Sequence, residues 1–422
     1  MLKTFTSQLL FLFILGLLIR LILAPITYHS DLLAYDFARE VLYTGHVATF
    51  YDYLPSLPDG NPLLAIYPMN QFNYPPSVYF FLGTTTFLST YFIPYEFHQQ
   101  FLFSVKDTFG NPVLFFHLFL LKLQFFFFDF GTAFLLMQFV KEKKKKLVAF
   151  GLWILNPVTL YASFMMGQFD IIPVFFTVLS LYLLLKYSSG ENKWLYYSSL
   201  ALGVGAAFKI WPLLLLPVLL AFIPHWKERV IAGIFAIGVY VLPILPFLTS
   251  SGFRSTALVA NQTQKSLVAQ IPVSGGESIL LFIVSMIFFY LVFFYRKGKL
   301  ENIWQRYMSI LLVFFVFTHF HPQWFLWLSP FLVFELLYNR GKHLIVVLLL
   351  LFAVKGMIFL FEPGLNIQLF VPIFPAIYDG PSIFQQLSIS IDTNYFRSIF
   401  HSIFTAGALY YLYAYFPTRE EK

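Results

Sequence analysis

Residues 9–26 read LLFLFILGLLIRLILAPI, an almost unbroken apolar run near the start of the chain. A run of this length can cross the hydrocarbon core of a bilayer as a helix. The residues that follow, YHSDLLAYD at 28–36, become polar within a few positions. The sequence therefore predicts an uncleaved first transmembrane helix, followed by Asp31 at the membrane surface, where its carboxylate can stay ionised.

The composition extends this prediction to the whole chain. Of 422 residues, 59% are hydrophobic and only 11% are charged, and the mean hydropathy is +0.74. A soluble protein of this length could not bury so much apolar surface, so we expect an all-α polytopic membrane protein. The net charge is +7, and the lysines and arginines cluster in short loops, as is typical of cytoplasmic loops. We therefore expect no nucleic-acid partner. The chain has no Cys and therefore no disulfide.

Short basic loops set the predicted topology. We place Lys3 and six loops on the cytoplasmic side: 141–146, 191–193, 227–229, 296–299, 340–342 and 419–422. Between them, apolar runs pair as crossings at 147–166 with 171–187, 195–209 with 212–224, 229–249 with 277–295, 304–319 with 323–338, and 342–361 with 396–415. The pair at 195–224 is short, and a half-inserted hairpin is the alternative there. The sequence predicts about 12 transmembrane helices in one domain, 1–422, of a multi-pass protein that lies in the plasma membrane if the source is prokaryotic.

The segment before residue 141 leaves two alternatives. Residues 28–75 are rich in Pro, Asp, Asn and Tyr, and we expect a long outer loop, helical near 31–43, before the remaining transmembrane bundle at 76–422. Either 111–140 is one long tilted span and 76–93 lies at the outer interface, or there are three crossings with 111–140 broken near Asp129.

Two charged residues, Lys122 and Asp129, lie seven apart near one face of the 111–140 run. Charges at membrane depth are costly and are usually paired or turned toward a cavity. We therefore expect these two side chains to bind each other or to line a cavity.

Polar residues at the predicted outer helix ends form the candidate site. They are His29, Asp31, Asp36, Gln168, Asp170, Lys209, His319, His321 and Gln323. Ionisable groups at this depth are functional candidates by default. The chain has no Walker loop and no G-x-G-x-x-G, which excludes soluble nucleotide chemistry. The sequence predicts a site on the non-cytoplasmic face that meets a lipid-borne substrate.

Seven motifs occur in order along the chain. They are DLLAYDFAREVLYTG at 31–45, YPP at 74–76, Asp129, WILNP at 153–157, GQFD at 167–170, KIWP at 209–212 and QWFLW at 323–327. Together they resemble the GT-C superfamily of glycosyltransferases over residues 28–338. The nearest likeness is to the catalytic subunit of GPI mannosyltransferase I and to bacterial polyprenyl-phosphate-mannose-dependent mannosyltransferases.

This resemblance implies a GT-C-like bundle and a polyprenyl- or dolichyl-phosphate sugar as donor, with mannose as the expected hexose. It also implies inverting transfer to a hydroxyl of a lipid or glycan acceptor on the outer face. The eukaryotic relative has an Asp-x-Asp pair in its first loop, and here the second Asp falls on Asp31 and the first on His29. With one carboxylate left, no cofactor is certain, and a divalent metal shared by His29, Asp31 and His321 stays open.

Each candidate also has a structural interpretation. We assign Asp31 as the general base that deprotonates the acceptor hydroxyl; the alternative is an N-cap for the helix at 31–43. We assign Lys209, His321 and Gln323 to the donor phosphate, whose charge fixed donors stabilise. The alternative for Lys209 is a side chain that snorkels to the interface. The alternative for His321 and Gln323 is a capped helix turn.

Four further residues are assigned to substrate binding: Gln168, Asp170, Asp36 and His29. Asp170 could instead cap a helix, and Asp36 could instead pair with Arg39. The rival functions are a transporter or flippase for lipid-linked sugar and a non-catalytic subunit of a glycan assembly complex. A transporter predicts functional charge on both faces and an internal repeat, and the sequence shows neither.

Overall fold

The computed structural model describes residues 4–187, 191–258, 264–319 and 321–417. Within these ranges the regular structure is almost all helical. The one sheet that they contain is a short antiparallel hairpin of β1 (Gln270–Pro272) and β2 (Ser278–Leu280), in which Gln270 pairs with Leu280. The predicted cytoplasmic charges at Lys3 and at 419–422 lie outside the described residues.

Long apolar helices confirm the predicted fold class. Among the described residues, three are long and apolar enough to cross a membrane: α1 (Phe5–Ile26), α6 (Pro112–Gln138) and the segment Lys143–Met165. This last segment joins α7 (Lys143–Ile154), α8 (Pro157–Thr159) and the π-helix η4 (Leu160–Met165). The shorter apolar helices include α9 (Ile171–Tyr187), α15 (Leu281–Tyr295) and α18 (Leu344–Leu360). The chain is an all-α polytopic membrane protein.

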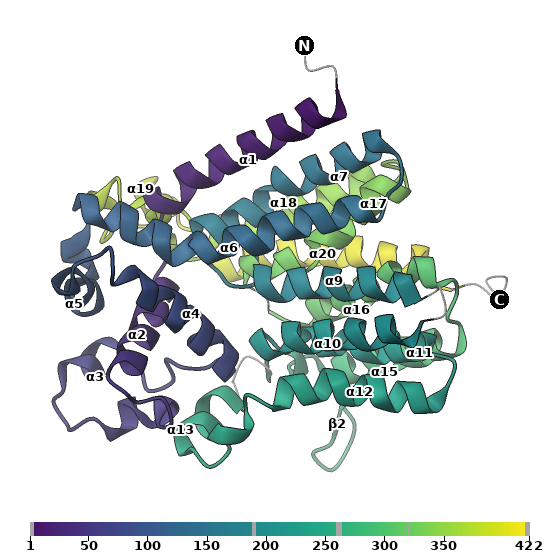
Figure 1. Ribbon diagram of the computed structural model, residues 1–422, viewed down its shortest axis with the longest axis horizontal. Helices are drawn as coiled ribbons and strands as arrows, with labels where there is room; N and C mark the ends of the chain where they lie inside the picture. The colour runs from purple at the N-terminus through teal and green to yellow at the C-terminus, as the bar shows by residue number, and fades with distance from the viewer. Residues whose placement is uncertain (1–3, 188–190, 259–263, 320, 418–422) are drawn as a thin grey trace.

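The remaining bundle helices overlap the apolar runs at which the sequence predicts crossings. They are α10 (Asn192–Phe208), α11 (Leu216–Phe222), α12 (Trp226–Val241), α16 (Ile303–Phe317), α17 (Ser329–Tyr338) and α20 (Thr393–Ala414). Helices α6, α9, α10 and α12 pack in that order, side by side (Figure 1). The apolar segment Trp211–Phe222 is about 18 Å long as a helix, which is shorter than the ~30 Å hydrocarbon core. This length favours the half-inserted alternative at 195–224.

Short helices gather at one end of the long ones, at the left of Figure 1. We call residues 31–103 the end layer; it contains α2 (Asp31–Tyr43), α3 (Pro62–Ile66), α4 (Pro76–Ser89) and α5 (Tyr95–Phe103). The helix expected at 31–43 is confirmed. Beside the layer lie α13 (Ser251–Phe253) and α19 (Ile383–Gln386).

Helix α4 decides between the two alternatives for the region before residue 141. Its 14 residues span about 21 Å, too little to cross the bilayer core, and it packs on α2 of the end layer. In contrast, α6 is one unbroken helix of 27 residues that passes through Asp129. The interpretation with a single long span at 111–140 therefore agrees with the structure.

A buried ion pair lets α6 carry Asp129 through the apolar core. Arg20 Nε of α1 donates to Asp129 Oδ2 at 2.6 Å, and Trp153 Nε1 donates to Asp129 Oδ1 at 2.9 Å. All three side chains are fully buried. A buried charge is tolerated when it is paired and hydrogen-bonded, so Asp129 and Trp153 of the WILNP motif join α1, α6 and α7.

Lys122 has different partners from those expected. Its Nζ donates to the carbonyl oxygens of Ala24 and Thr27 at 2.9 and 2.6 Å, where α1 ends. The last carbonyls of a helix have no partner within it and carry partial negative charge, which favours a cation there. The expectation that Lys122 binds Asp129 is wrong because α1 offers each of them a closer partner.

Candidate active site

A cavity of about 310 Å³ lies where α2 meets the turns at 167–170 and 321–324. We call it the polar cavity, because hydroxyl, amide, imidazole and carboxylate groups line much of it. Five predicted site residues line it: His29, Asp31, Gln168, His321 and Gln323. The convergence of these distant segments is what the sequence predicted for the outer helix ends.

Asp31 opens into the polar cavity from the first turn of α2. Ser30 occupies the N-cap position, and the Asp31 carboxylate accepts a hydrogen bond from Gln168 Nε2 at 2.6 Å. Its side chain is 46% exposed. The first turn of a helix favours a carboxylate, and Asp31 is held there with its side chain accessible from the polar cavity. The alternative that Asp31 is the N-cap does not agree with the structure.

The turn that carries Gln168 requires a glycine. Gly167 has φ +73°, a left-handed conformation that glycine adopts without strain. A Cβ at this position would lie 2.6 Å from Leu32 Cδ2 of α2. Tyr35 on α2 also donates its hydroxyl to the Gly167 carbonyl at 3.0 Å. The turn therefore packs directly on α2, and this contact places Gln168 against Asp31.

Asp170 and Lys209 form a buried ion pair beside the polar cavity. Lys209 Nζ lies 2.8 and 3.1 Å from the two carboxylate oxygens of Asp170, and Trp327 Nε1 donates to Asp170 Oδ1 at 2.6 Å. The Asp170 side chain is fully buried and that of Lys209 is 9% exposed. The Asp170 carboxylate is thus used by Lys209 and Trp327, and the Lys209 ammonium is already neutralised.

Four aromatic rings surround the Lys209 ammonium. Nζ lies 5.3–5.4 Å from the ring centroids of Tyr74, Phe169, Trp324 and Trp327. Cations are attracted to such ring faces. Four of the motifs that carry the family resemblance, at 74–76, 167–170, 209–212 and 323–327, therefore meet at this one ammonium group.

An apolar groove continues from the polar cavity. It has a volume of about 470 Å³ and shares Asn73, Tyr74 and Trp324 with the polar cavity. Lys209 lines the groove near these shared residues, and leucine, isoleucine and phenylalanine side chains from 213–214, 267, 282–283 and 314 line much of the rest. A polar chamber and an apolar channel are thus joined at Tyr74 and Trp324, with a buried ammonium at the junction.

The sequence pattern of the family described as glycosyltransferase family 87 matches residues 108–318, which is half of the chain. The chain belongs to glycosyltransferase family 87. The match confirms the prediction of a membrane glycosyltransferase, while the narrower likeness to mannosyltransferases has no support in it. No curated protein and no solved structure matches the chain.

The matched part of this family 87 protein contains Gln168, Asp170 and Lys209, begins after Asp31 and ends just before His321. His321 and Gln323 complete the wall of the polar cavity. Burial and the nearby charge of Lys265 lower the pKa of His321 to about 4, so its imidazole is neutral near pH 7. Gln323 Oε1 is buried and has no hydrogen-bond partner among the described residues. Both side chains are therefore suited to hydrogen bonds with a neutral sugar.

Asp36 lies apart from the polar cavity. It is fully buried, and its Oδ1 lies 2.8 Å from Arg39 Nε and 2.9 Å from His98 Nδ1. Burial raises the pKa of Asp36, but the hydrogen bond from His98 and the charge of Arg39 outweigh it and lower the pKa to about 2. The alternative interpretation, in which Asp36 pairs with Arg39, is confirmed.

Sequence reasoning missed a second carboxylate in the polar cavity. Glu362 follows α18 and lines the cavity together with Asp31. It ends an apolar run in the last predicted outer loop, so the rule that selected the other candidates could have selected it. Tyr74 and Trp324 each belong to one of the motifs, but nothing in the sequence indicates that their rings meet at Lys209.

Proposed function

We propose that this family 87 protein is a GT-C type glycosyltransferase that moves a hexose from a polyprenyl- or dolichyl-phosphate donor to a hydroxyl of a lipid or glycan acceptor. Mannose is the first sugar to test. The observation that carries the proposal is the accessible Asp31 carboxylate in a polar cavity that continues into an apolar groove at Lys209. A lipid-linked sugar has these same two parts, one polar and one apolar.

The chemistry follows from this arrangement. Asp31 accepts the proton of the acceptor hydroxyl while that oxygen attacks the anomeric carbon of the donor. The bond between this carbon and the phosphate oxygen breaks, and polyprenyl phosphate leaves with the electron pair. A single displacement inverts the anomeric centre, so a β-linked donor gives an α-linked product. Gln168 holds Asp31 in position through its 2.6 Å hydrogen bond.

Lys209 supports the departing phosphate in this proposal. Phosphate needs no proton to leave, only stabilisation of its charge. Because Asp170 already neutralises Lys209, we assign to Asp170 the positioning of the ammonium rather than contact with substrate. The polyprenyl chain occupies the apolar groove, and the sugar lies in the polar cavity near His321, Gln323 and His29.

The location is part of the same proposal. The predicted topology puts the basic loops in the cytoplasm and the end layer on the opposite face, so transfer takes place at the non-cytoplasmic surface of a multi-pass protein. The whole chain, 1–422, acts as one catalytic unit, and the bundle and the end layer each supply part of the site.

A transfer assay with purified protein tests the proposal. The protein in lipid nanodiscs receives radiolabelled polyprenyl-phosphate mannose, with and without glycolipid acceptors, and the labelled product is separated from the donor. We expect acceptor-dependent product from the native chain and a strongly reduced rate from Asp31→Asn. Equal turnover by that variant would contradict the base role. Movement of intact donor across vesicles without any product would support the transporter instead.

A further inference from the structure

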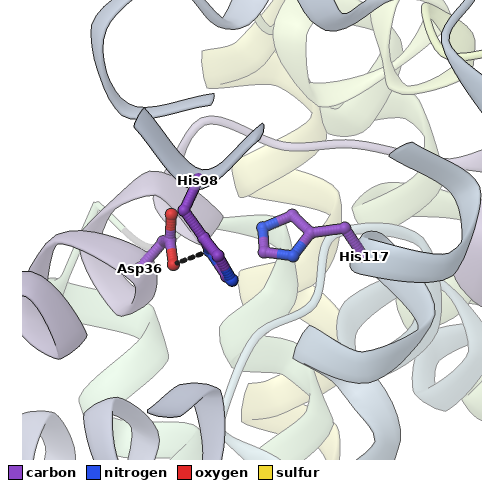
Figure 2. Close-up of side chains that lie close together, drawn as sticks. All are labelled: Asp36, His98 and His117. Atoms are coloured by element: carbon purple, nitrogen blue, oxygen red, sulfur yellow. Dashed lines mark hydrogen bonds and ion pairs between the residues drawn. The ribbon is translucent and has the colours of Figure 1, made fainter. Parts of the chain in front are cut away.

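Asp36 and His98, on α2 and α5 of the end layer, meet His117 on the neighbouring helix α6 (Figure 2). All three side chains are fully buried. One potential ligand atom from each lies within 4.8 Å of the other two. Of the described residues that line the polar cavity and the apolar groove, none belongs to this trio, so the proposed glycosyl transfer leaves it without a role.

The trio contains several polar atoms that ordinary hydrogen bonding does not explain. Asp36 Oδ1 is bound by Arg39 and His98. Within the described part of the chain, however, Asp36 Oδ2, His98 Nε2 and both ring nitrogens of His117 are buried without a hydrogen-bond partner. Buried polar side chains nearly always have partners. Such atoms in three side chains whose potential ligand atoms lie within 4.8 Å of one another indicate a ligand that would bind at least one atom from each.

His117 is the most informative member. Its imidazole points toward His98 in Figure 2, and the two ring centroids are 4.9 Å apart at 85°. The other rings beside it belong to Phe97 and Phe101, at 5.6 and 4.7 Å. Near phenylalanine side chains alone, a leucine would fit as well as a histidine, so packing does not explain why an imidazole occupies this position.

Two imidazoles and one carboxylate are the donor set of many divalent transition-metal sites. Zinc in particular binds histidine nitrogen and carboxylate oxygen at about 2.0–2.2 Å, and side-chain rotations would bring the three atoms to these distances. We propose that Asp36, His98 and His117 bind a divalent transition-metal ion of the zinc type. Asp36 Oδ2 binds the ion, while Oδ1 keeps its bond to Arg39 and so fixes the carboxylate, as outer partners of metal ligands do.

The nearby arginine does not prevent this assignment. Arg39 Nη1 lies 3.2 Å from Glu40 Oε2, and Arg39 Nε contacts Asp36. The guanidinium charge is therefore shared between two carboxylates. The proposed ion joins α2 to α5 and α6. Asp31 also lies on α2. The role is therefore structural, and it is separate from the metal considered for His29, Asp31 and His321, whose ligand atoms do not gather into such a group among the described residues.

The test measures zinc rather than transfer, so it does not depend on the proposed function. Full-length protein in detergent is treated with a chelator, loaded with Zn²⁺ and desalted, and bound zinc is measured by elemental analysis. Thermal unfolding is recorded with and without the ion. We expect stoichiometric zinc and a higher unfolding midpoint in its presence. Both should be lost in His117→Leu and reduced in His98→Gln.

Matched histidine variants make the result decisive. His46 is only partly buried and lies outside the trio, and His321 lines the polar cavity, so His46→Ala and His321→Ala should both retain the zinc. His117→Leu should still fold, because it removes an imidazole that has no hydrogen-bond partner among the described residues. The proposal is overturned if native protein binds no more zinc than His117→Leu. It is also overturned if His46→Ala or His321→Ala loses the ion equally, or if zinc leaves the unfolding midpoint of the native chain unchanged.

Discussion

Asp31 and Asp36 lie five residues apart on α2 and have opposite environments. The Asp31 side chain is 46% exposed in the polar cavity, whereas Asp36 is fully buried against Arg39 and His98. Five residues turn a helix by about 140°, so the two carboxylates face opposite sides. The exposed one is free to exchange a proton with a substrate, and the buried one holds elements together. In the proposed function, the same residue type on one helix thus serves chemistry on one face and structure on the other.

The largest predicted effect is on the exposed carboxylate. Asp31→Asn should lower the transfer rate by about 10²–10⁴-fold, because it removes the proton acceptor, and should leave the thermal unfolding midpoint unchanged. Initial rates from the nanodisc assay and a melting curve measure the two effects. Asp59→Asn, at an exposed turn, is the matched control and should match the native chain in both. A clear drop in the thermal unfolding midpoint of Asp31→Asn would contradict the idea that Asp31, unlike Asp36, does not stabilise the fold.

The buried carboxylate should show the reverse pattern. Asp36→Asn breaks the fully buried pair with Arg39 and leaves the guanidinium only Glu40 as a charge partner, and breaking a buried pair costs about 3–5 kcal/mol. We expect a lower unfolding midpoint and a rate per folded molecule within a few-fold of native. The readouts are melting curves and rates normalised to monodisperse protein. Native stability combined with lost transfer would return Asp36 to the substrate-binding role that the sequence suggested.

A third carboxylate, Asp170, forms a buried ion pair with Lys209. Substitutions in this pair test whether a buried ion pair can also contribute to glycosyl transfer. Lys209→Met should lower kcat/KM by about 10²-fold, the usual effect of removing one charge-stabilising group. Asp170→Asn should act through the position of Lys209 and have a smaller effect. The double variant should lose less than the sum of the single losses, because neither charge is then left unpaired. Additive losses in this cycle would show that Asp170 and Lys209 act separately.

The smallest effect concerns His321 and pH. Because the pKa of His321 is lowered to about 4, the folded protein keeps it neutral between pH 5 and pH 8, and His321→Gln should leave the shape of the pH–rate profile unchanged there. For stability, an unfolded chain takes up a proton near the ordinary histidine pKa of about 6.5, so the native chain should lose stability as the pH falls from 6.5 toward 4. His321→Gln should lose less over that interval. An acid limb near pH 6.5 that disappears in the variant would contradict this.

Much of the fold and part of the site followed from the sequence. The apolar run at 9–26 predicted α1, because the length and hydropathy of a run depend on local residues and on the thickness of the bilayer. The run at 111–140 predicted either one long span or a break near Asp129, and only the structure showed that α6 is unbroken. Polar residues at the helix ends on one side predicted that His29, Gln168, His321 and Gln323 would lie near Asp31. Topology alone brings such ends to one surface.

The pairing of charges was beyond the reach of the sequence. Asp129 binds Arg20 rather than Lys122, Lys209 is neutralised by Asp170, and Glu362 enters the polar cavity from a distant segment. Each outcome depends on which faces of two helices meet, and that is fixed by side-chain packing across the whole bundle. Local pattern determined that these groups would lie in or beside the membrane; only the tertiary structure determined which became accessible and which became part of the core.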